Sequence, residues 1–339
     1  MVKKISILLL STLLLSILFI SCHHDYGDRD FEEVVAVANR GAGSVSFVDA
    51  ITNDVLSTLE IPNSQPMYVV YVKSKDKLYV GDRAGNKVHV IDPETKTVES
   101  SIDVGNGVFH MWADGLGRRL WVNNDVDNTT SVIDLHTNTV IETIDIGIKP
   151  HDVFVNKQGT RAYISVLSGN AQVADSIYMY SAITFQKLAS RGVGKDPHVF
   201  HLIRGNDLFV PCQSGTIYKL NGRNLNVEST LDLPGTHGIF ASPNQRKLFV
   251  ANIGGAQLYT IKASNNTQIG NAVATPDVIP HNIAVNKRGD KIFVTHSGMT
   301  ANKLSTYSVT RSGAITADTD LITLETNPFG LAYYKRRVD

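Results

Sequence analysis

The sequence has few cysteines, no excess of charge of either sign and none of the short motifs that mark common enzyme classes. Only Cys22 and Cys212 occur in the 339 residues, which excludes a disulfide-rich scaffold and a four-cysteine zinc site. The 32 acidic and 32 basic side chains balance, so nothing in the charge favours nucleic acid as a partner. His-Glu-x-x-His, Gly-x-Ser-x-Gly, Cys-x-x-Cys and a phosphate-cradling glycine loop are all missing, and no catalytic residue is assigned.

The amino terminus predicts export. Lys3 and Lys4 precede an apolar run over residues 5–20, and Ser21 and Cys22 follow it. This order is typical of a secretory signal, and the run is short for a stable membrane span, so residues 1–21 are predicted to be removed. Residues 19–22 resemble a bacterial lipobox, although Phe19 stands where leucine is usual. The resemblance implies that Cys22 carries lipid and anchors the protein in the bacterial outer membrane.

A polar, acidic segment follows the lipidation position. Residues 22–33 are predicted to form a solvated tether. The segment resembles the signal that directs lipoproteins of the Bacteroidota to the cell surface, which leaves the periplasmic and the surface leaflet both open. With Cys22 lipidated, Cys212 has no disulfide partner, and we interpret it as a small buried hydrophobic residue.

Internal repeats dominate the rest of the chain. An apolar strand ending in Val or Ile recurs at intervals of roughly 40 to 46 residues, the spacing of four-stranded propeller blades. Short apolar runs separated by turn residues surround each copy and predict strands throughout. The recurring strands lie at residues 77–80, 119–122, 161–164, 207–210, 247–250 and 291–294. They define six complete units at 65–106, 107–148, 149–195, 196–234, 235–279 and 280–326.

The two ends of the chain together supply one further unit. Residues 34–61 contain three strands, and residues 327–334 contain one. Joined in one blade, they close the ring and remove exposed sheet edges. We therefore predict an all-β fold over residues 34–339, a seven-bladed β-propeller that is monomeric.

The repeats resemble the YVTN family of propellers. The segments 78–82, 248–252 and 90–98 follow its pattern of strand, turn and strand, and the resemblance covers about residues 34–335. Surface-layer proteins and cobalamin-capturing lipoproteins are similar propellers. The resemblance implies a fold much more than an activity, because propellers host enzymes, metal sites and binding surfaces alike.

Histidines recur near the start of the first strand of the repeat. Counting thirteen residues back from the end of each recurring strand gives Met67, Phe109, His151, Pro197, His237 and His281, with Phe329 at the matching place in the last fragment. His110 and His198 fall one residue later, which we interpret as variation in turn length. First strands line the channel of a propeller, so these side chains are expected to converge around its axis.

The far ends of the second strands are expected at the same face of the ring, because neighbouring strands are antiparallel. We therefore assign a ligand-binding role to the histidines and to the polar residues at those ends: His110, His151, His198, His237, His281, His296, Asp82, Asn124 and Asn252. Because Met67 and Phe329 interrupt the series, the site is expected off the axis, toward the histidine-bearing blades.

Three interpretations of the histidines stay open. In the first, the histidines form hydrogen bonds between blades and have a structural role. In the second, they hold copper or zinc, with His151, His237 and His281 as ligands. In the third, they hold an organic ligand such as a corrinoid. The second pattern is similar to the propeller of nitrous oxide reductase, but the chain lacks that enzyme's cupredoxin domain. The third is similar to cobalamin-capturing lipoproteins that serve an outer-membrane transporter.

The favoured function is a non-catalytic binding lipoprotein of the cell envelope, which holds a small ligand or a partner protein such as a transporter. The alternative is a metal-dependent enzyme or metal carrier that uses the same histidines. His237 or His281 would be the base of such an enzyme, but no carboxylate partner can be identified from spacing.

Overall fold

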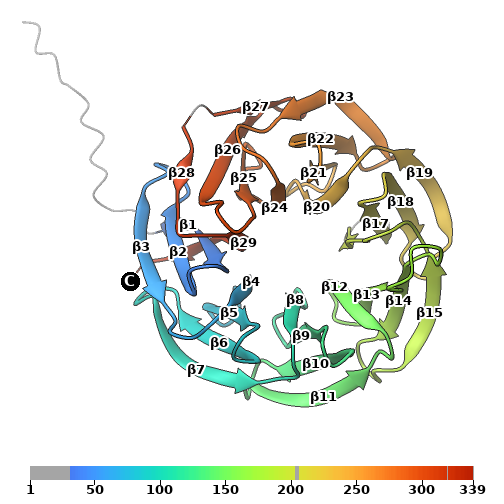
Figure 1. The fold of residues 1–339 in the computed structure, drawn as a ribbon, viewed down its shortest axis with the longest axis horizontal. Helices are drawn as coiled ribbons and strands as arrows, with labels where there is room; N and C mark the ends of the chain where they lie inside the picture. The colour runs from blue at the N-terminus through green and yellow to red at the C-terminus, as the bar shows by residue number, and fades with distance from the viewer. Residues whose placement is uncertain (1–30, 203–205, 319, 339) are drawn as a thin grey trace, which may run out of the picture.

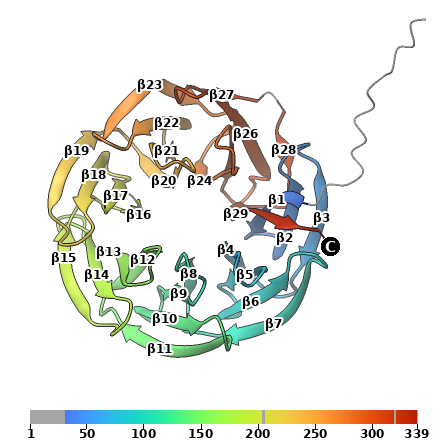
Figure 2. The same ribbon diagram turned by 180° about the vertical axis from the view of Figure 1, so that it is seen from behind.

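A computed structural model describes residues 31–202, 206–318 and 320–338. The predicted signal segment, Cys22 and most of the acidic tether lie outside these residues. The part of the chain that is described contains 29 strands, and the described residues include no helix that could cross a membrane. Seven antiparallel sheets stand in a ring around a central axis, which confirms the predicted seven-bladed propeller (Figures 1 and 2). We call the region around this axis, which the side chains of the first strands occupy, the channel.

We name the sheets blades A to G. Listed from the channel outward, the strands of blades A to D are β29 (Pro328–Arg337), β1 (Phe31–Asn39), β2 (Ser44–Asp49) and β3 (Val55–Glu60) in A; β4 (Pro66–Val72), β5 (Lys77–Asp82), β6 (Lys87–Asp92) and β7 (Thr97–Asp103) in B; β8 (Val108–Ala113), β9 (Arg119–Asn124), β10 (Thr129–Asp134) and β11 (Thr139–Asp145) in C; β12 (Lys149–Val155), β13 (Arg161–Leu167), β14 (Ser176–Ser181) and β15 (Lys187–Gly192) in D.

The remaining blades follow the same order. Their strands are β16 (Phe200–His201), β17 (Asp207–Cys212), β18 (Thr216–Asn221) and β19 (Val227–Asp232) in E; β20 (Thr236–Ala241), β21 (Lys247–Asn252), β22 (Gln257–Lys262) and β23 (Thr267–Ala274) in F; β24 (Pro280–Val285), β25 (Lys291–His296), β26 (Lys303–Val309), β27 (Ile315–Ala317) and β28 (Ile322–Thr323) in G, where both β27 and β28 pair with β26.

Burial differs systematically between the strands of a blade. The second strands are buried along almost their whole length, whereas the outer strands alternate between exposed and half-buried residues. The aromatic residues of the second strands, such as Tyr79, Tyr163 and Phe249, are at most 1% exposed and pack between neighbouring blades. Burial of such large apolar side chains is the main stabilising term of the fold. The core therefore lies between blades, and the channel is lined by different residues.

The same aspartate-stabilised turn follows the third strand in blades A to C. Asp92 Oδ1 accepts the backbone N–H groups of Glu94 at 2.8 Å and Thr95 at 3.0 Å. Lys96 then takes a left-handed conformation, with φ of 54°. The same contacts start from Asp49 and Asp134 in the neighbouring blades. An aspartate that bonds backbone groups two and three residues later favours a tight turn, which explains the recurring Asp-x-x-Thr of the repeats.

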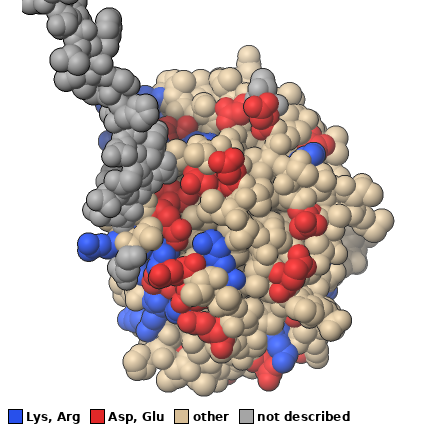
Figure 3. All heavy atoms as spheres, turned by 90° about the vertical axis from the view of Figure 1, so that its left-hand side faces the viewer, with Lys and Arg blue, Asp and Glu red and all other residues tan. Residues whose placement is uncertain are grey.

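The ring is closed within blade A, as the sequence predicts. β29 pairs with β1 from Phe31↔Arg337 to Val37↔Leu331, so the first strand begins three residues before the predicted start at Val34. Arg336 links this blade to blade B, because its guanidinium lies 3.1 Å from Glu32, 3.1 Å from Asp76 and 3.0 Å from Glu94. Figure 3 shows basic and acidic side chains interspersed on the side of the molecule that carries this blade.

Candidate functional site

The first strands carry a β-bulge where they line the channel. In blade D, Pro150 pairs with Val166 and Val153 with Ile164, so one extra residue is accommodated between these pairs. The same shift occurs in the first strands of blades A, B, C, F and G. A bulge interrupts the ladder and changes the direction of side chains. Consequently both His151 and Asp152 reach the cluster of side chains in the channel.

Blade E differs from the others. Pro197 pairs with Cys212 and Phe200 with Phe209, so the register stays in step and no residue is extra. His198 then occupies the channel position alone, and Pro197 corresponds to Pro150 rather than to His151. The one-residue offset of His198 thus comes from a missing bulge. The offset of His110 has another cause, because His110 is the second residue of its own bulge, equivalent to Asp152.

The five histidines predicted near the starts of the first strands, His110, His151, His198, His237 and His281, meet in the channel. Neighbouring rings stand 4.8 Å apart for His151 and His198, 3.9 Å for His198 and His237, and 4.6 Å for His237 and His281, measured between ring centres. His110 lies 5.3 Å from His151. Each of the five side chains is buried.

Phe109 and Phe329 complete the circle of side chains. Phe109 lies 5.1 Å from the ring of His151, and Phe329 lies 4.2 Å from the ring of His281. The guanidinium groups of Arg83 and Arg40 stand over these two phenylalanines, at 5.9 Å and 5.3 Å. These aromatic–cation contacts place apolar and positively charged groups beside the histidines.

Two carboxylates that the sequence analysis did not identify stand among the histidines. Asp152 Oδ1 lies 2.7 Å from His110 Nδ1, and its Oδ2 lies 3.4 Å from His198 Nδ1. Asp196 Oδ1 lies 3.0 Å from His151 Nε2, and its Oδ2 lies 3.9 Å from His237 Nε2. Asp152 follows His151 directly, and Asp196 lies two residues before His198. Adjacency to the histidines was the available signal. Regular strand alternation would point Asp152 away from the channel. Asp196 precedes its strand and takes a left-handed conformation, with φ of 51°, so alternation does not place its side chain.

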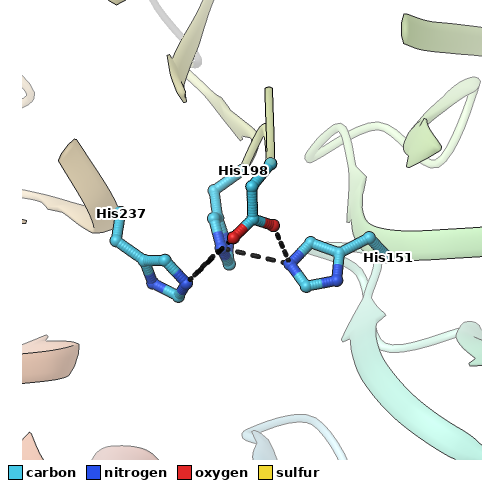
Figure 4. A group of neighbouring side chains, drawn as sticks. His151, His198 and His237 are labelled. Carbon is cyan, nitrogen blue, oxygen red and sulfur yellow. Dashed lines mark hydrogen bonds and ion pairs between the residues drawn. The ribbon is translucent and has the colours of Figure 1, made fainter. Parts of the chain in front are cut away.

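Four of these residues present their ligand atoms to one point. His198 Nε2 lies 3.2 Å from His151 Nε2 and 3.0 Å from His237 Nε2 (Figure 4). Asp196 stands beside them, 3.0 Å from His151. All four ligand atoms of His151, Asp196, His198 and His237 lie within 4.8 Å of one another. The residues come from blades D, E and F, so the group lies to one side of the channel axis.

Asp152 sets the protonation of two histidines. A carboxylate accepts a proton from an imidazole, so Nδ1 of both His110 and His198 carries the hydrogen and Nε2 keeps its lone pair. Tyr68 donates its hydroxyl to His110 Nε2 at 2.5 Å, which uses that lone pair. The lone pair on His198 Nε2 instead points into the group of four. Asp152 is itself fixed by the backbone N–H of Val199, at 2.9 Å.

Burial and mutual contact determine the charges in the channel. Burial lowers the pKa of His110 to about 4, although Asp152 opposes this effect. Burial, with the neighbouring histidines, also holds the pKa values of His237 and His281 well below the ordinary value. Burial alone would raise the pKa values of Asp152 and Asp196, but contact with the histidines holds both below the ordinary value. At neutral pH the imidazoles of His110, His237 and His281 are therefore neutral, and the carboxylates of Asp152 and Asp196 are ionised.

His281 was predicted as a metal ligand but lies outside the group of four. Its Nδ1 accepts a hydrogen bond from Asn282 Nδ2 at 2.6 Å, and its ring packs between His237 and Phe329. His198 takes the place that the sequence analysis gave to His281. The exchange follows from the missing bulge in blade E, which brings His198 toward His151 and His237.

The remaining predicted site residues are held inside their own blades. His296 Nε2 is 2.7 Å from Ser305 Oγ, and its Nδ1 is 2.8 Å from the carbonyl of Val278. Asp82 contacts His89 at 3.3 Å, and the amide nitrogens of Asn124 and Asn252 donate to side chains at 2.9 Å. Cys212 is also buried, which raises its pKa to about 12. These side chains stabilise strand ends and do not join the histidine cluster.

A small cavity of about 70 Å³ lies next to the cluster in the channel. Tyr68, His110, Asp152 and His198 line one part of it, and aromatic residues of the first strands line another. Its volume suits one or two water molecules.

Comparisons with known proteins support the fold. No protein-family model matches the sequence, and no curated protein matches it. A putative 6-phosphogluconolactonase from Bacteroides fragilis is similar in structure, with a TM-score of 0.71 and 14% identity over 89% of this chain and 98% of that chain. Hydrazine synthase from Kuenenia stuttgartiensis is similar too, with a TM-score of 0.66 and 15% identity over 84% of this chain and 92% of that chain. At these identities the likeness concerns the propeller fold alone.

Proposed function

We propose that the protein binds one divalent transition-metal ion in its channel, through Nε2 of His151, His198 and His237 and a carboxylate oxygen of Asp196. The main support for this proposal is the spacing of these atoms. Ligands about 2.0–2.1 Å from a tetrahedral zinc ion stand about 3.3–3.4 Å from one another. Along the series His237, His198, His151 and Asp196, the separations of 3.0 Å, 3.2 Å and 3.0 Å lie close to that edge length.

The chemistry of the donors favours zinc or copper. Neutral imidazole nitrogens suit these ions, whereas calcium and magnesium prefer oxygen ligands. The low pKa of His237 keeps a lone pair of its imidazole available at neutral pH. Asp152 orients His198 from behind, which is the usual arrangement of a carboxylate behind a metal-binding histidine.

The geometry favours binding over catalysis. Three histidines and one aspartate complete a tetrahedral shell, whereas catalytic zinc keeps a position open for water or substrate. The adjoining cavity of about 70 Å³ is also far smaller than the roughly 300 Å³ of a typical pocket for an organic ligand. The metal interpretation therefore has more support than a corrinoid held at the histidines, and a non-catalytic metal-binding role more than an enzyme.

The cellular setting is part of the same proposal. The apolar run over residues 5–20 and Cys22 support an exported lipoprotein of the outer membrane, and the repeats support membership of the YVTN propellers. In this setting a monomeric metal-binding propeller would pass its ion to an envelope protein such as a transporter. Metabolic labelling with a radioactive fatty acid tests the anchor: label is expected on the wild type and absent from Cys22→Ala.

Metal titration tests the site. The purified protein is treated with a chelator, and zinc is then titrated against a competing indicator. We expect one tight site per chain, and a loss of affinity of at least a hundredfold in His198→Ala, because three ligands would remain. His136→Ala is the matched control, since His136 is an exposed histidine in a turn of blade C, and it should bind zinc like the wild type. Equal zinc affinity of His198→Ala and wild type would refute the site.

Cobalt gives a second measurement. Tetrahedral cobalt(II) absorbs visible light far more strongly than six-coordinate cobalt, so the wild-type spectrum should show intense bands. The bands should weaken in Asp196→Asn, which removes a charged ligand but keeps the size of the side chain. A weak, six-coordinate spectrum in the wild type would contradict a site made of these four residues.

A further inference from the structure

The opposite end of the channel is lined by an arc of aromatic side chains. In blades C to F, the first-strand position that pairs with an aromatic residue of the second strand holds large aromatic side chains, namely Trp112, Phe154, Phe200 and Phe240. Their rings form a continuous series: 4.4 Å separates Trp112 from Phe154, 4.9 Å separates Phe154 from Phe200, and 5.3 Å separates Phe200 from Phe240. The same position holds the smaller residues Val70, Ala284 and Ala332 in blades B, G and A.

This difference in side-chain size leaves a cavity. Large rings on one side and small residues on the other enclose about 490 Å³, within the range of about 300–1,000 Å³ of small-molecule pockets. The cavity reaches the turns that join first to second strands, including Ser74, Gly115 and Pro243. The small cavity beside the histidines shares Trp112 and Phe240 with it and separates it from the metal ligands.

The arc remains partly accessible to a ligand. Trp112 and Phe240 are only half-buried, whereas Trp121, the other tryptophan of the chain, is fully buried in the core. Flat aromatic faces that line a concave apolar wall bind flat apolar groups well, because stacking adds to the burial of surface. The arc therefore suits a planar body.

The cavity wall carries two positive groups that are free to contact a ligand and one negative group that is already bonded. Lys73 and Lys157 are exposed, and neither has an ion pair or hydrogen bond of its ammonium group among the described residues. The carboxylate of Asp114 is buried and accepts backbone N–H groups of Leu116 at 2.8 Å and Arg119 at 3.0 Å. The two ammonium groups at the rim thus favour a ligand with a negative charge.

We propose that this cavity is a binding site for a small anionic amphiphile, whose planar apolar body lies against Trp112, Phe154, Phe200 and Phe240 and whose anionic group lies near Lys73 and Lys157. The site is separate from the metal site and does not depend on it. The ring of first strands thus builds two binding places at different depths of one channel.

Two fluorescent probes test the proposal. Anilinonaphthalene sulfonate has a planar aromatic body with a negative charge, and N-phenyl-1-naphthylamine has nearly the same body without the charge. Binding is measured from the rise in probe emission, on chelator-treated protein and again with zinc. We expect one saturable site for both probes and tighter binding of the anionic one. The result should be the same with and without zinc, so failure of the metal proposal would leave this test intact.

Variants of the wall locate the probe. Ala332→Phe fills the small side of the cavity at a half-buried position and should weaken both probes at least tenfold. Phe240→Leu should weaken both about threefold, because a ring face is lost but apolar surface remains. Circular dichroism and thermal melting establish that each variant is folded. Unchanged binding in a folded Ala332→Phe protein would overturn the site.

Variants of the rim test the charge. Lys73→Gln with Lys157→Gln should weaken only the anionic probe, by about three- to tenfold at low salt, since screened surface charges contribute modestly. The control is Lys87→Gln with Lys187→Gln, which removes the same charge from β6 and β15, strands on the outer side of their blades. Equal loss for both probes, or for both double variants, would overturn the anionic assignment. Multiple weak probe sites unaffected by any variant would mean adventitious binding and overturn the proposal as a whole.

Discussion

The two ends of the channel are built from the same strands yet have opposite chemistry. Near their starts the first strands present His151, Asp152 and His198, whose polar atoms are buried and bonded to one another. Farther along, the same strands present Trp112 and Phe154, which stack. Both sets are concentrated on blades C to F. The seven repeats supply equivalent positions, and the departures from equivalence produce a cluster of histidines and carboxylates and an apolar cavity.

The two ends also contribute differently to stability. Buried carboxylates such as Asp152 are costly unless their oxygens are bonded, so the polar end contributes little net stability. The aromatic arc removes large apolar surfaces from water and stabilises the fold directly. Substitutions at the aromatic end should therefore affect unfolding most, and substitutions at the polar end should affect metal binding most.

The largest effect on stability is expected from Phe154→Ala. Phe154 is 7% exposed and lies between Trp112 and Phe200, so truncation leaves a cavity. The free energy of unfolding should fall by about 3–5 kcal/mol, measured by urea denaturation. Zinc affinity of the folded variant should stay within a factor of three. Phe154→Leu is the control and should lose much less stability. A strong loss of zinc affinity with little loss of stability would contradict the view that the aromatic end of the channel serves mainly stability.

Gly238→Ala should reduce both the stability of the fold and the affinity for zinc. Gly238 is the second bulge residue of blade F, and a Cβ atom there would collide with the backbone carbonyl of His281 in the next blade. The backbone must shift, so unfolding free energy should fall by about 1–3 kcal/mol, and the adjacent His237 should be displaced. Zinc affinity should fall as well. Gly254→Ala is the control, because a Cβ atom there meets no neighbour. Equal behaviour of the two variants would contradict this account.

Asp152→Asn should affect metal binding more than folding. Asparagine keeps the size of the side chain but cannot accept protons from both His110 and His198 as a carboxylate does. The orientation of His198 is then less well defined, and zinc affinity should fall about 10- to 100-fold. Isothermal titration gives the affinity, and urea denaturation of the metal-free protein gives the stability. A change in stability with unchanged zinc affinity would show that Asp152 has only a structural role.

Much of the fold could be predicted from the sequence, because the recurring strands repeat in every blade and the turns after the third strands of blades A to C share an aspartate. The joint closing blade follows from the two incomplete fragments. The convergence of the histidines follows from their common place in the repeat. These properties depend on local pattern and on symmetry, both of which a single sequence displays.

The composition of the site could not be predicted in the same way. It depends on a bulge that most first strands have and blade E lacks, and the bulge has no residue signature of its own. The missing bulge moved His198 into the group and left His281 outside it. Asp152 was missed because strand alternation places the neighbour of a channel residue on the opposite side. Asp196 was missed because it lies in the turn before its strand, where the repeat pattern does not fix the direction of a side chain. Asn124, Asn252 and His296 look equivalent to channel residues in the sequence, but each bonds within its own blade.

The smallest effect is expected at His281, which separates the sequence-based ligand set from the structural one. His281 packs against His237 at 4.6 Å and against Phe329, and its Nδ1 is bonded to Asn282. In His281→Phe the packing surface remains and only polar atoms are lost, so zinc affinity should change less than threefold. His237→Phe loses a ligand from the neighbouring blade and should weaken zinc binding at least a hundredfold. The two variants make the same substitution in adjacent first strands, so differences in folding largely cancel. A loss at His281 as large as that at His237 would mean that the metal lies closer to the channel axis, and would restore the ligand set expected from the repeat.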